Sequence, residues 1–157
     1  MKKVLFSILA LAGLLLLSGE VSRNVLAQNA PPAPTTCSNA TLAGTYVFEE
    51  TGSTVGPHGA LSPFVFSGIE VYAGDGTAHG VGTQTSIVNG QTTVQSNVPF
   101  TGVYTVNANC TVQETDTQGG VQSHFDQFLQ PSGDKFTFVE TDPGVIAGGT
   151  ETRGPAK

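Results

Sequence analysis

The chain has 157 residues, a net charge of −6 at pH 7, and 38% hydrophobic against only 11% charged residues. A surplus of carboxylates repels phosphate backbones, so we expect no nucleic-acid partner. The length suits one domain with a single hydrophobic core.

The first 27 residues have the pattern of a signal peptide. Lys2 and Lys3 precede an apolar run over Val4–Leu17, and Val25-Leu26-Ala27 places small or modest side chains at the positions that a signal peptidase reads. We expect cleavage after Ala27, with Ala30 as the alternative. The apolar run is too short to cross a bilayer comfortably, so cleavage is favoured over the alternative of an uncleaved anchor. We expect no stable membrane insertion of the mature chain. The pattern predicts a secreted or periplasmic protein.

The expected mature chain, residues 28–157, is more acidic than the whole. It carries three basic and eleven acidic side chains, hence a net charge of −8. Residues 28–36 are rich in proline and predict a linker with little to bury. We expect a barrel domain over 37–153 and a tail over 154–157.

Two cysteines, Cys37 and Cys110, lie in this expected mature chain. An exported protein meets an oxidising compartment, which favours a structural disulfide between them. On the chain-entropy argument, closing a loop of about 74 residues stabilises the fold by roughly 4 kcal/mol.

Alternating apolar and polar residues, bounded by glycine, proline and asparagine, predict a series of strands. In chain order the expected strands are 45–51, 64–72, 77–88, 91–98, 100–106, 110–117, 121–130, 135–141 and 145–152. Asn89-Gly90 predicts a tight hairpin, because both turn positions need positive φ. Residues 52–63 predict a long loop, and Pro99 predicts a break in the strand pairing.

No amphipathic helix of ten residues or more follows the leader. Eight or nine short strands joined by tight turns predict an all-β fold, an antiparallel up-and-down meander of about eight strands. We expect it to close into a small β-barrel, because closure removes edge strands and glycines such as Gly68 and Gly102 suit a strongly coiled wall. A β-sandwich is the alternative.

Three segments resemble a group of exported, mostly uncharacterised bacterial proteins. They are Cys-Ser-Asn-Ala-Thr-Leu-Ala-Gly-Thr-Tyr at 37–46, Phe-Thr-Gly-Val-Tyr-Thr-Val-Asn-Ala-Asn-Cys at 100–110, and Thr-Asp-Pro-Gly at 141–144. The resemblance implies a small calycin-like barrel, similar in outline to lipocalins and to the allene oxide cyclase barrel. It implies no activity, and the chain has no Trp with which to form the Gly-x-Trp pattern of lipocalins.

Aromatic residues gather on one face of the predicted strands. They are Tyr46, Phe48, Phe64, Phe66, Tyr72, Phe100, Tyr104, Phe136 and Phe138. An eight-stranded barrel is either filled by such side chains or holds one small ligand. We therefore keep two interpretations, an aromatic core and a site for a small apolar or amphipathic ligand. The candidate ligand-binding residues are Phe66, Glu70, Tyr72, Tyr104 and Phe138.

Three carboxylates, Glu50, Glu70 and Glu140, share the aromatic faces. An unpaired buried carboxylate is costly, and basic partners are scarce. Glu50 and Glu140 stand near predicted strand ends, so a solvated barrel mouth is expected for both. Glu70 lies further within its strand. With Tyr72 or Tyr104 it is a candidate catalytic acid or base, or a group that orients a ligand.

Other motifs point away from metal and cofactor chemistry. His124 and Asp126 alternate with an apolar residue, and we expect them on a polar outer face rather than in a metal site. His58 and His79 have no ligand partner nearby, and the turn at Asp75 lacks the further carboxylates of a calcium loop. No nucleophile elbow or phosphate-binding loop is present. We expect no metal and no cofactor.

Three functions remain open. The first is a secreted barrel that binds a small apolar or amphipathic ligand. The second is a structural or envelope-associated protein with a filled barrel. The third is a barrel isomerase or cyclase, and we favour the binding protein over an enzyme.

Overall fold

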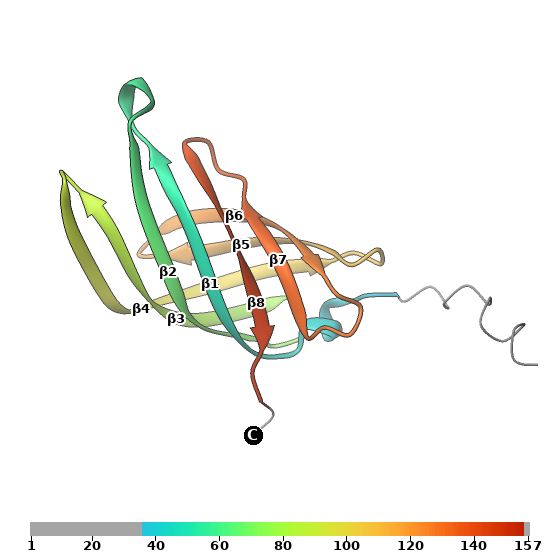
Figure 1. The fold of residues 1–157 in the computed structure, drawn as a ribbon. Coiled ribbons are helices and arrows are strands. Elements are labelled where there is room, and N and C mark those ends of the chain that lie inside the picture. Colours follow the sequence, from blue (N-terminus) through green and yellow to red (C-terminus); the bar gives the residue numbers. More distant parts are fainter. Residues whose placement is uncertain (1–35, 156–157) are drawn as a thin grey trace, which may run out of the picture. The chain divides into compact units, whose positions relative to one another are not determined.

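The computed structural model describes residues 36–155 of the chain (Figure 1). The expected signal peptide over 1–27, the linker up to residue 35, and the last two residues of the expected tail lie outside these described residues. Between residues 36 and 155, no helix is long and apolar enough to cross a membrane.

Eight antiparallel strands follow one another along the chain and close into a barrel (Figure 1). The strands are β1 (Gly44–Val55), β2 (Leu61–Tyr72), β3 (Thr77–Val88), β4 (Gln91–Val106), β5 (Thr111–Gln118), β6 (Val121–Leu129), β7 (Lys135–Glu140) and β8 (Val145–Arg153). Two short 3₁₀ helices complete the described part, η1 (Asn39–Leu42) and η2 (Pro57–Gly59). The prediction of an all-β meander closed into a small barrel is therefore confirmed, and the sandwich is excluded.

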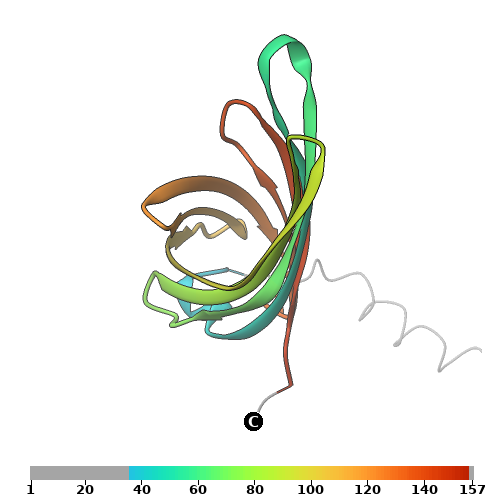
Figure 2. The ribbon, with the colours of Figure 1, turned by 90° about the vertical axis from the view of Figure 1, so that its left-hand side faces the viewer.

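Each strand pairs with the next, and β1 also pairs with β8, where Glu49 lies opposite Thr150. Figure 2 shows the resulting curl of the sheet around the interior. Side chains alternate between the two faces of the wall, as the sequence pattern requires. In β1, Tyr46, Phe48 and Glu50 point inward and are buried, whereas the residues between them are exposed.

The predicted long loop over 52–63 is wrong, because most of it is strand. β1 continues to Val55 and β2 begins at Leu61, which pairs with Val55, so only the short turn around η2 is irregular. His58 in this turn has φ of 60°, in the left-handed region. Pro63 fits its strand because the pairing of β2 with β3 begins only at Phe64, which leaves one edge of β2 free at the proline.

The predicted break at Pro99 is also wrong, since β4 runs through this residue. The pairing of β4 with β5 begins at Thr101, so the chain at Pro99 is bonded to a neighbour on one side only. A bulge just before it sets Ser96 and Asn97 opposite Thr83 of β3, with Asn97 at φ of 56°. The irregularity that Pro99 signals is thus a bulge within one long strand rather than the end of a strand.

One end of the barrel is covered by η1, whose Leu42 is fully buried. The Arg153 guanidinium at the end of β8 lies 4.8 Å from the centre of the Tyr46 ring. This guanidinium also donates hydrogen bonds to the backbone carbonyls of Thr41, Ala43 and Gly133. The cation therefore fastens η1 and the loop between β6 and β7 to the same end of the barrel, which we call the closed end.

The Cys37–Cys110 disulfide ties the segment before η1 to the start of β5, with 5.1 Å between the Cα atoms. The sequence prediction of this bond is confirmed. Most of the hydrophobic core lies at this end of the barrel. It comprises Cys37, Leu42, Tyr46, Tyr72, Ala78, Tyr104, Cys110, Val112, Leu129, Phe136 and Phe138.

Candidate functional site

A cavity of about 420 Å³ lies at the opposite end of the barrel from η1. Its lining includes Thr54 of the β1–β2 hairpin and Asp142 and Val145 of the β7–β8 hairpin; the tips of both hairpins are at the top of Figure 1. Aromatic side chains form its apolar lining, and four carboxyl groups form much of its polar lining. The aromatic residues are Phe64, Phe66, Phe100 and Phe125, and the acidic residues are Glu50, Asp116, Glu140 and Asp142.

Two rings of this lining, Phe66 and Phe100, pack together with Phe48, which lies behind them and does not line this cavity. The ring of Phe48 lies 5.0 Å from that of Phe66 and 5.7 Å from that of Phe100, centre to centre, with both pairs edge to face. Phe66 and Phe100 are themselves 5.9 Å apart. Such edge-to-face pairs favour a fixed arrangement of the rings. The cavity wall therefore has a definite apolar shape.

A second, much smaller cavity of about 30 Å³ shares part of its wall with the first, including Glu50, Phe66 and Asp116. Its remaining lining is largely polar for a barrel interior. The polar residues found here and not in the larger cavity are Glu70, Glu114, Gln127 and Glu151. We call these four residues together with Asp116 the acidic cluster.

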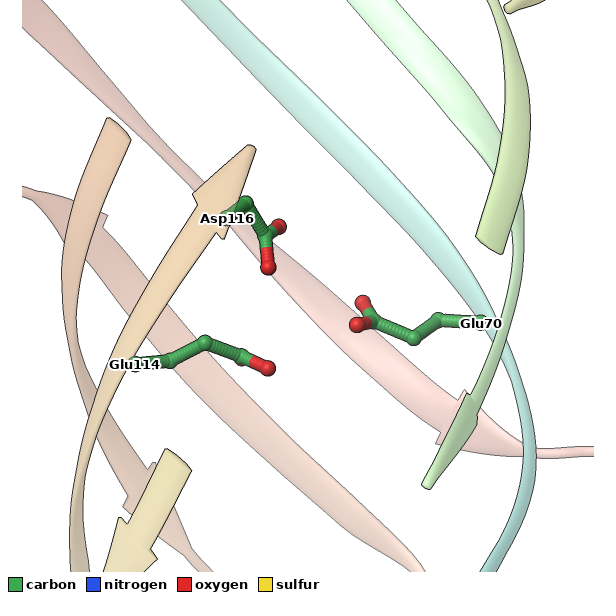
Figure 3. A group of neighbouring side chains, drawn as sticks. All are labelled: Glu70, Glu114 and Asp116. Atoms are coloured by element: carbon green, nitrogen blue, oxygen red, sulfur yellow. The ribbon is translucent and has the colours of Figure 1, made fainter. Parts of the chain in front are cut away.

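Only some of the side-chain oxygen atoms in the acidic cluster accept a hydrogen bond. The Tyr72 hydroxyl lies 3.0 Å from Glu114 Oε2 and 3.3 Å from Glu151 Oε1, and the Gln127 amide donates to the same Glu114 oxygen. One side-chain oxygen of every member of the cluster is buried without a hydrogen-bond partner. Figure 3 shows Glu70 reaching from one wall toward Glu114 and Asp116 on the facing wall.

Burial makes these carboxyl groups hard to ionise. Desolvation, followed by the nearby charges of Glu140 and Asp116, raises the pKa of Glu50 to about 8. Desolvation likewise raises the pKa of Asp116 to about 7 and that of Glu70 well above its ordinary value, with Glu114 as the next contributor for Glu70. The buried carboxyl oxygens therefore need a hydrogen-bond donor, a bound cation or a proton of their own to stabilise them.

The structure brings together most, but not all, of the residues that the sequence singled out. Phe66 lines both cavities, Glu70 and Phe138 line the small one, and the Tyr72 hydroxyl reaches the acidic cluster. Tyr104 instead lies at the closed end, where its hydroxyl accepts a hydrogen bond from the Gly74 amide at 2.9 Å. It lines neither cavity.

Glu50 does not stand at a solvated mouth, as its predicted place near a strand end implied. It is 6% exposed and lines both cavities. The expectation is wrong because β1 continues five residues past Glu50, to Val55, which moves the carboxyl group into the wall of the barrel. Glu140, the last residue of β7, is half-buried at the large cavity.

The outer face also agrees with the sequence pattern. His124 and Asp126 of β6 are exposed, and they alternate with the half-buried Phe125. The His124 ring lies 2.8 Å from a carboxylate oxygen of Asp142. The His124–Asp142 pair and Asp126 thus lie at the surface of the barrel.

Four members of the acidic cluster escaped the sequence reasoning, namely Glu114, Asp116, Gln127 and Glu151. A signal for one of them existed. Tyr104, expected in the interior, lies directly opposite Glu114 across the β4–β5 hairpin. Because opposed residues in an antiparallel pair face the same side, an inward Tyr104 implies an inward Glu114.

Comparison of the chain with protein-family models, with curated proteins and with solved structures finds no match. The cavity, its lining and its charged groups therefore carry the functional argument.

Proposed function

We propose that this barrel binds a small amphipathic molecule in the cavity of about 420 Å³. The observation that carries the proposal is the cavity itself, whose volume falls in the range of small-molecule sites. A barrel filled by its own side chains, the structural alternative, would leave no such space.

The lining indicates the chemistry of the ligand. Phe64, Phe66 and Phe100 offer an apolar wall to a ring or a short hydrocarbon part. Glu50 and Asp116 face the same cavity and would accept hydrogen bonds from the polar end of the ligand or balance a positive charge on it. The proposed ligand thus has an apolar part of aromatic size and a basic or hydrogen-bond-donating end.

Among residues 36–155, no contact favours the isomerase or cyclase alternative over binding. Of its two candidate tyrosines, Tyr72 is 1% exposed with its hydroxyl among buried carboxyl groups, and Tyr104 is bonded at the closed end. Glu70 lines the small cavity rather than the large one. We therefore limit the proposal to binding.

Isothermal titration with three matched probes tests it: 2-naphthylmethylamine, 2-naphthylmethanol and 2-naphthoate. We expect the amine to bind most tightly, the alcohol more weakly and the anion not at all. Phe66→Ala should weaken binding of the amine at least tenfold, which is about 1.4 kcal/mol. Above pH 8, where the Glu50 carboxyl group is ionised, Glu50→Gln should reduce the preference for the amine over the alcohol.

Phe128→Ala is the matched control. Phe128 of β6 is 55% exposed and lines neither cavity. It removes the same phenyl group without touching the proposed site. Equal loss of affinity in Phe66→Ala and Phe128→Ala, or no binding of any probe to the unaltered protein, would overturn the proposal.

We also propose that the protein is exported, as a member of the calycin-like bacterial proteins that its segments resemble. The disulfide and the closed eight-stranded barrel support this proposal. Expression of the full chain in a bacterial host, followed by mass spectrometry of the periplasmic fraction, tests it. The expected mass corresponds to cleavage after Ala27, and an uncleaved cytoplasmic chain would contradict it.

A further inference from the structure

Three carboxyl groups meet inside the barrel below the aromatic lining. One oxygen each from Glu70 of β2 and from Glu114 and Asp116 of β5 lie within 4.8 Å of one another (Figure 3). We propose that these three residues, with the side-chain amide oxygen of Gln127, bind one calcium ion. This site shares Asp116 with the wall of the ligand cavity, but Glu70, Glu114 and Gln127 line only the small cavity, and a metal site there goes beyond the proposed function.

A cluster of acidic residues alone would not indicate a metal, but the amide oxygen of Gln127 is a second and independent observation. Gln127 is 2% exposed, and its amide nitrogen donates to Glu114. This leaves its carbonyl oxygen buried, at the wall of the small cavity, without a hydrogen-bond partner. A carboxylate can be neutralised by a proton, whereas a neutral amide oxygen needs a donor or a cation.

No side chain of the described part supplies that cation. Arg153 is engaged at the closed end by backbone carbonyls, and Lys135 is exposed on β7. The unpartnered oxygens of the cluster are therefore buried without a lysine or arginine counter-charge from the chain between residues 36 and 155. A small bound cation would satisfy several of them at once.

The donor atoms and the space indicate which cation. All the oxygens come from carboxyl and amide groups, the set that hard cations such as Ca²⁺ and Mg²⁺ prefer over zinc or copper. The small cavity has about 30 Å³, which leaves little room for the several waters that Mg²⁺ keeps. Ca²⁺ accepts a cage made mostly of protein oxygens. The shared wall at Asp116 gives an entry route from the larger cavity.

This proposal departs from the sequence expectation of no metal. That expectation rested on the lack of ligands at close spacing, but the ligands here come from β2, β5 and β6. Barrel closure brings Glu70 within reach of Glu114 although 43 other residues separate them in the chain.

The test is titration of the chelator-stripped protein with CaCl₂ at pH 7.5, followed by calorimetry and thermal unfolding. We expect one Ca²⁺ per chain, with a dissociation constant of about 1 mM or tighter. A hundredfold excess over this constant should raise the unfolding midpoint by about 5–10 °C. Terbium provides a second readout, because bound Tb³⁺ emits when a nearby tyrosine is excited, and Tyr72 contacts Glu114.

Glu70→Gln and Asp116→Asn should each weaken calcium binding and terbium emission at least tenfold. Two substitutions on the outer face, Glu49→Gln and Asp126→Asn, remove the same charges from exposed positions and should leave both unchanged. Circular dichroism of each variant checks that the barrel is folded. With two interior variants, the test still decides if one of them does not fold.

Three outcomes would overturn the calcium site. They are the absence of heat and of a shift in the unfolding midpoint at 10 mM Ca²⁺, equal binding by interior and outer-face variants, and binding of Mn²⁺ or Mg²⁺ without Ca²⁺. Because Glu70 lines only the small cavity, Glu70→Gln distinguishes the two proposals: it should weaken calcium binding and leave the affinity for the naphthyl probes unchanged.

Discussion

Glu50 offers a sharp test of the electrostatics inside this barrel. Its carboxyl group is 6% exposed, and burial raises its pKa from 4.5 to about 8 in the folded protein. The folded state therefore keeps a proton between pH 4.5 and 8 that the unfolded state has released. The stability that the protein gains by burying a protonated Glu50 is fully present below about pH 4.5 and is lost as the pH rises toward 8.

The expected magnitude follows from these two pKa values. Each pH unit between them lowers the free energy of unfolding by up to about 1.4 kcal/mol for this one group. From pH 5 to pH 8 the loss is about 3 kcal/mol. Glu50→Gln keeps the shape and removes the titration. The variant should match the unaltered protein near pH 5 and be about 3 kcal/mol more stable at pH 8.

Urea unfolding at pH 5, 6, 7 and 8, in buffer with a chelator, measures this difference. Glu49→Gln is the control, because Glu49 is the next residue of β1 but is exposed on the outer face. Its free energy of unfolding should follow the unaltered protein at every pH. Parallel profiles for Glu50→Gln and the unaltered protein would refute the claim that burial holds a proton on Glu50.

Three further predictions concern stability and can be checked by the same urea unfolding at pH 6. Tyr72→Phe should lower the free energy of unfolding by about 1–3 kcal/mol, because two buried carboxyl groups lose their hydroxyl partner; an unchanged value would mean that these contacts contribute nothing. Reduction of the Cys37–Cys110 disulfide should cost about 4 kcal/mol, and a protein insensitive to reductant would contradict this. Gly68→Ala should destabilise by more than about 3 kcal/mol, since an added Cβ would overlap a backbone carbonyl of β3, while Ser67→Ala, at the neighbouring exposed position, should cost much less.

Much of the fold follows from local patterns in the sequence. Period-two alternation and the Asn89-Gly90 turn act over a few residues, so they predict strands and hairpins without knowledge of the whole. The break expected at Pro99 and the part of the expected 52–63 loop that rested on Pro63 share one physical cause. Proline rules describe strands bonded on both sides, whereas Pro63 and Pro99 lie where a strand has one free edge.

The candidate site was less accessible to sequence reasoning. Phe66 and Glu70 share a face with aromatic neighbours, and this marked them as inward. Glu114 and Glu151 carry no such mark, because polar residues on a strand ordinarily face water. Their inward direction depends on cross-strand register and on barrel closure, which single-strand patterns do not contain.

The pairing of β1 with β8 has a consequence for how the chain folds. Every other strand pair joins neighbours in sequence, whereas Glu49 meets Thr150 across about 100 residues. Contacts this distant in the chain form slowly, because bringing the two strands together costs loop-closure entropy before their pairing stabilises them. We expect a curved sheet with two open edges to form early. We expect β8 to pair with β1 last and so to close the barrel. Because β8 carries Arg153, the same late step would also anchor η1 at the closed end.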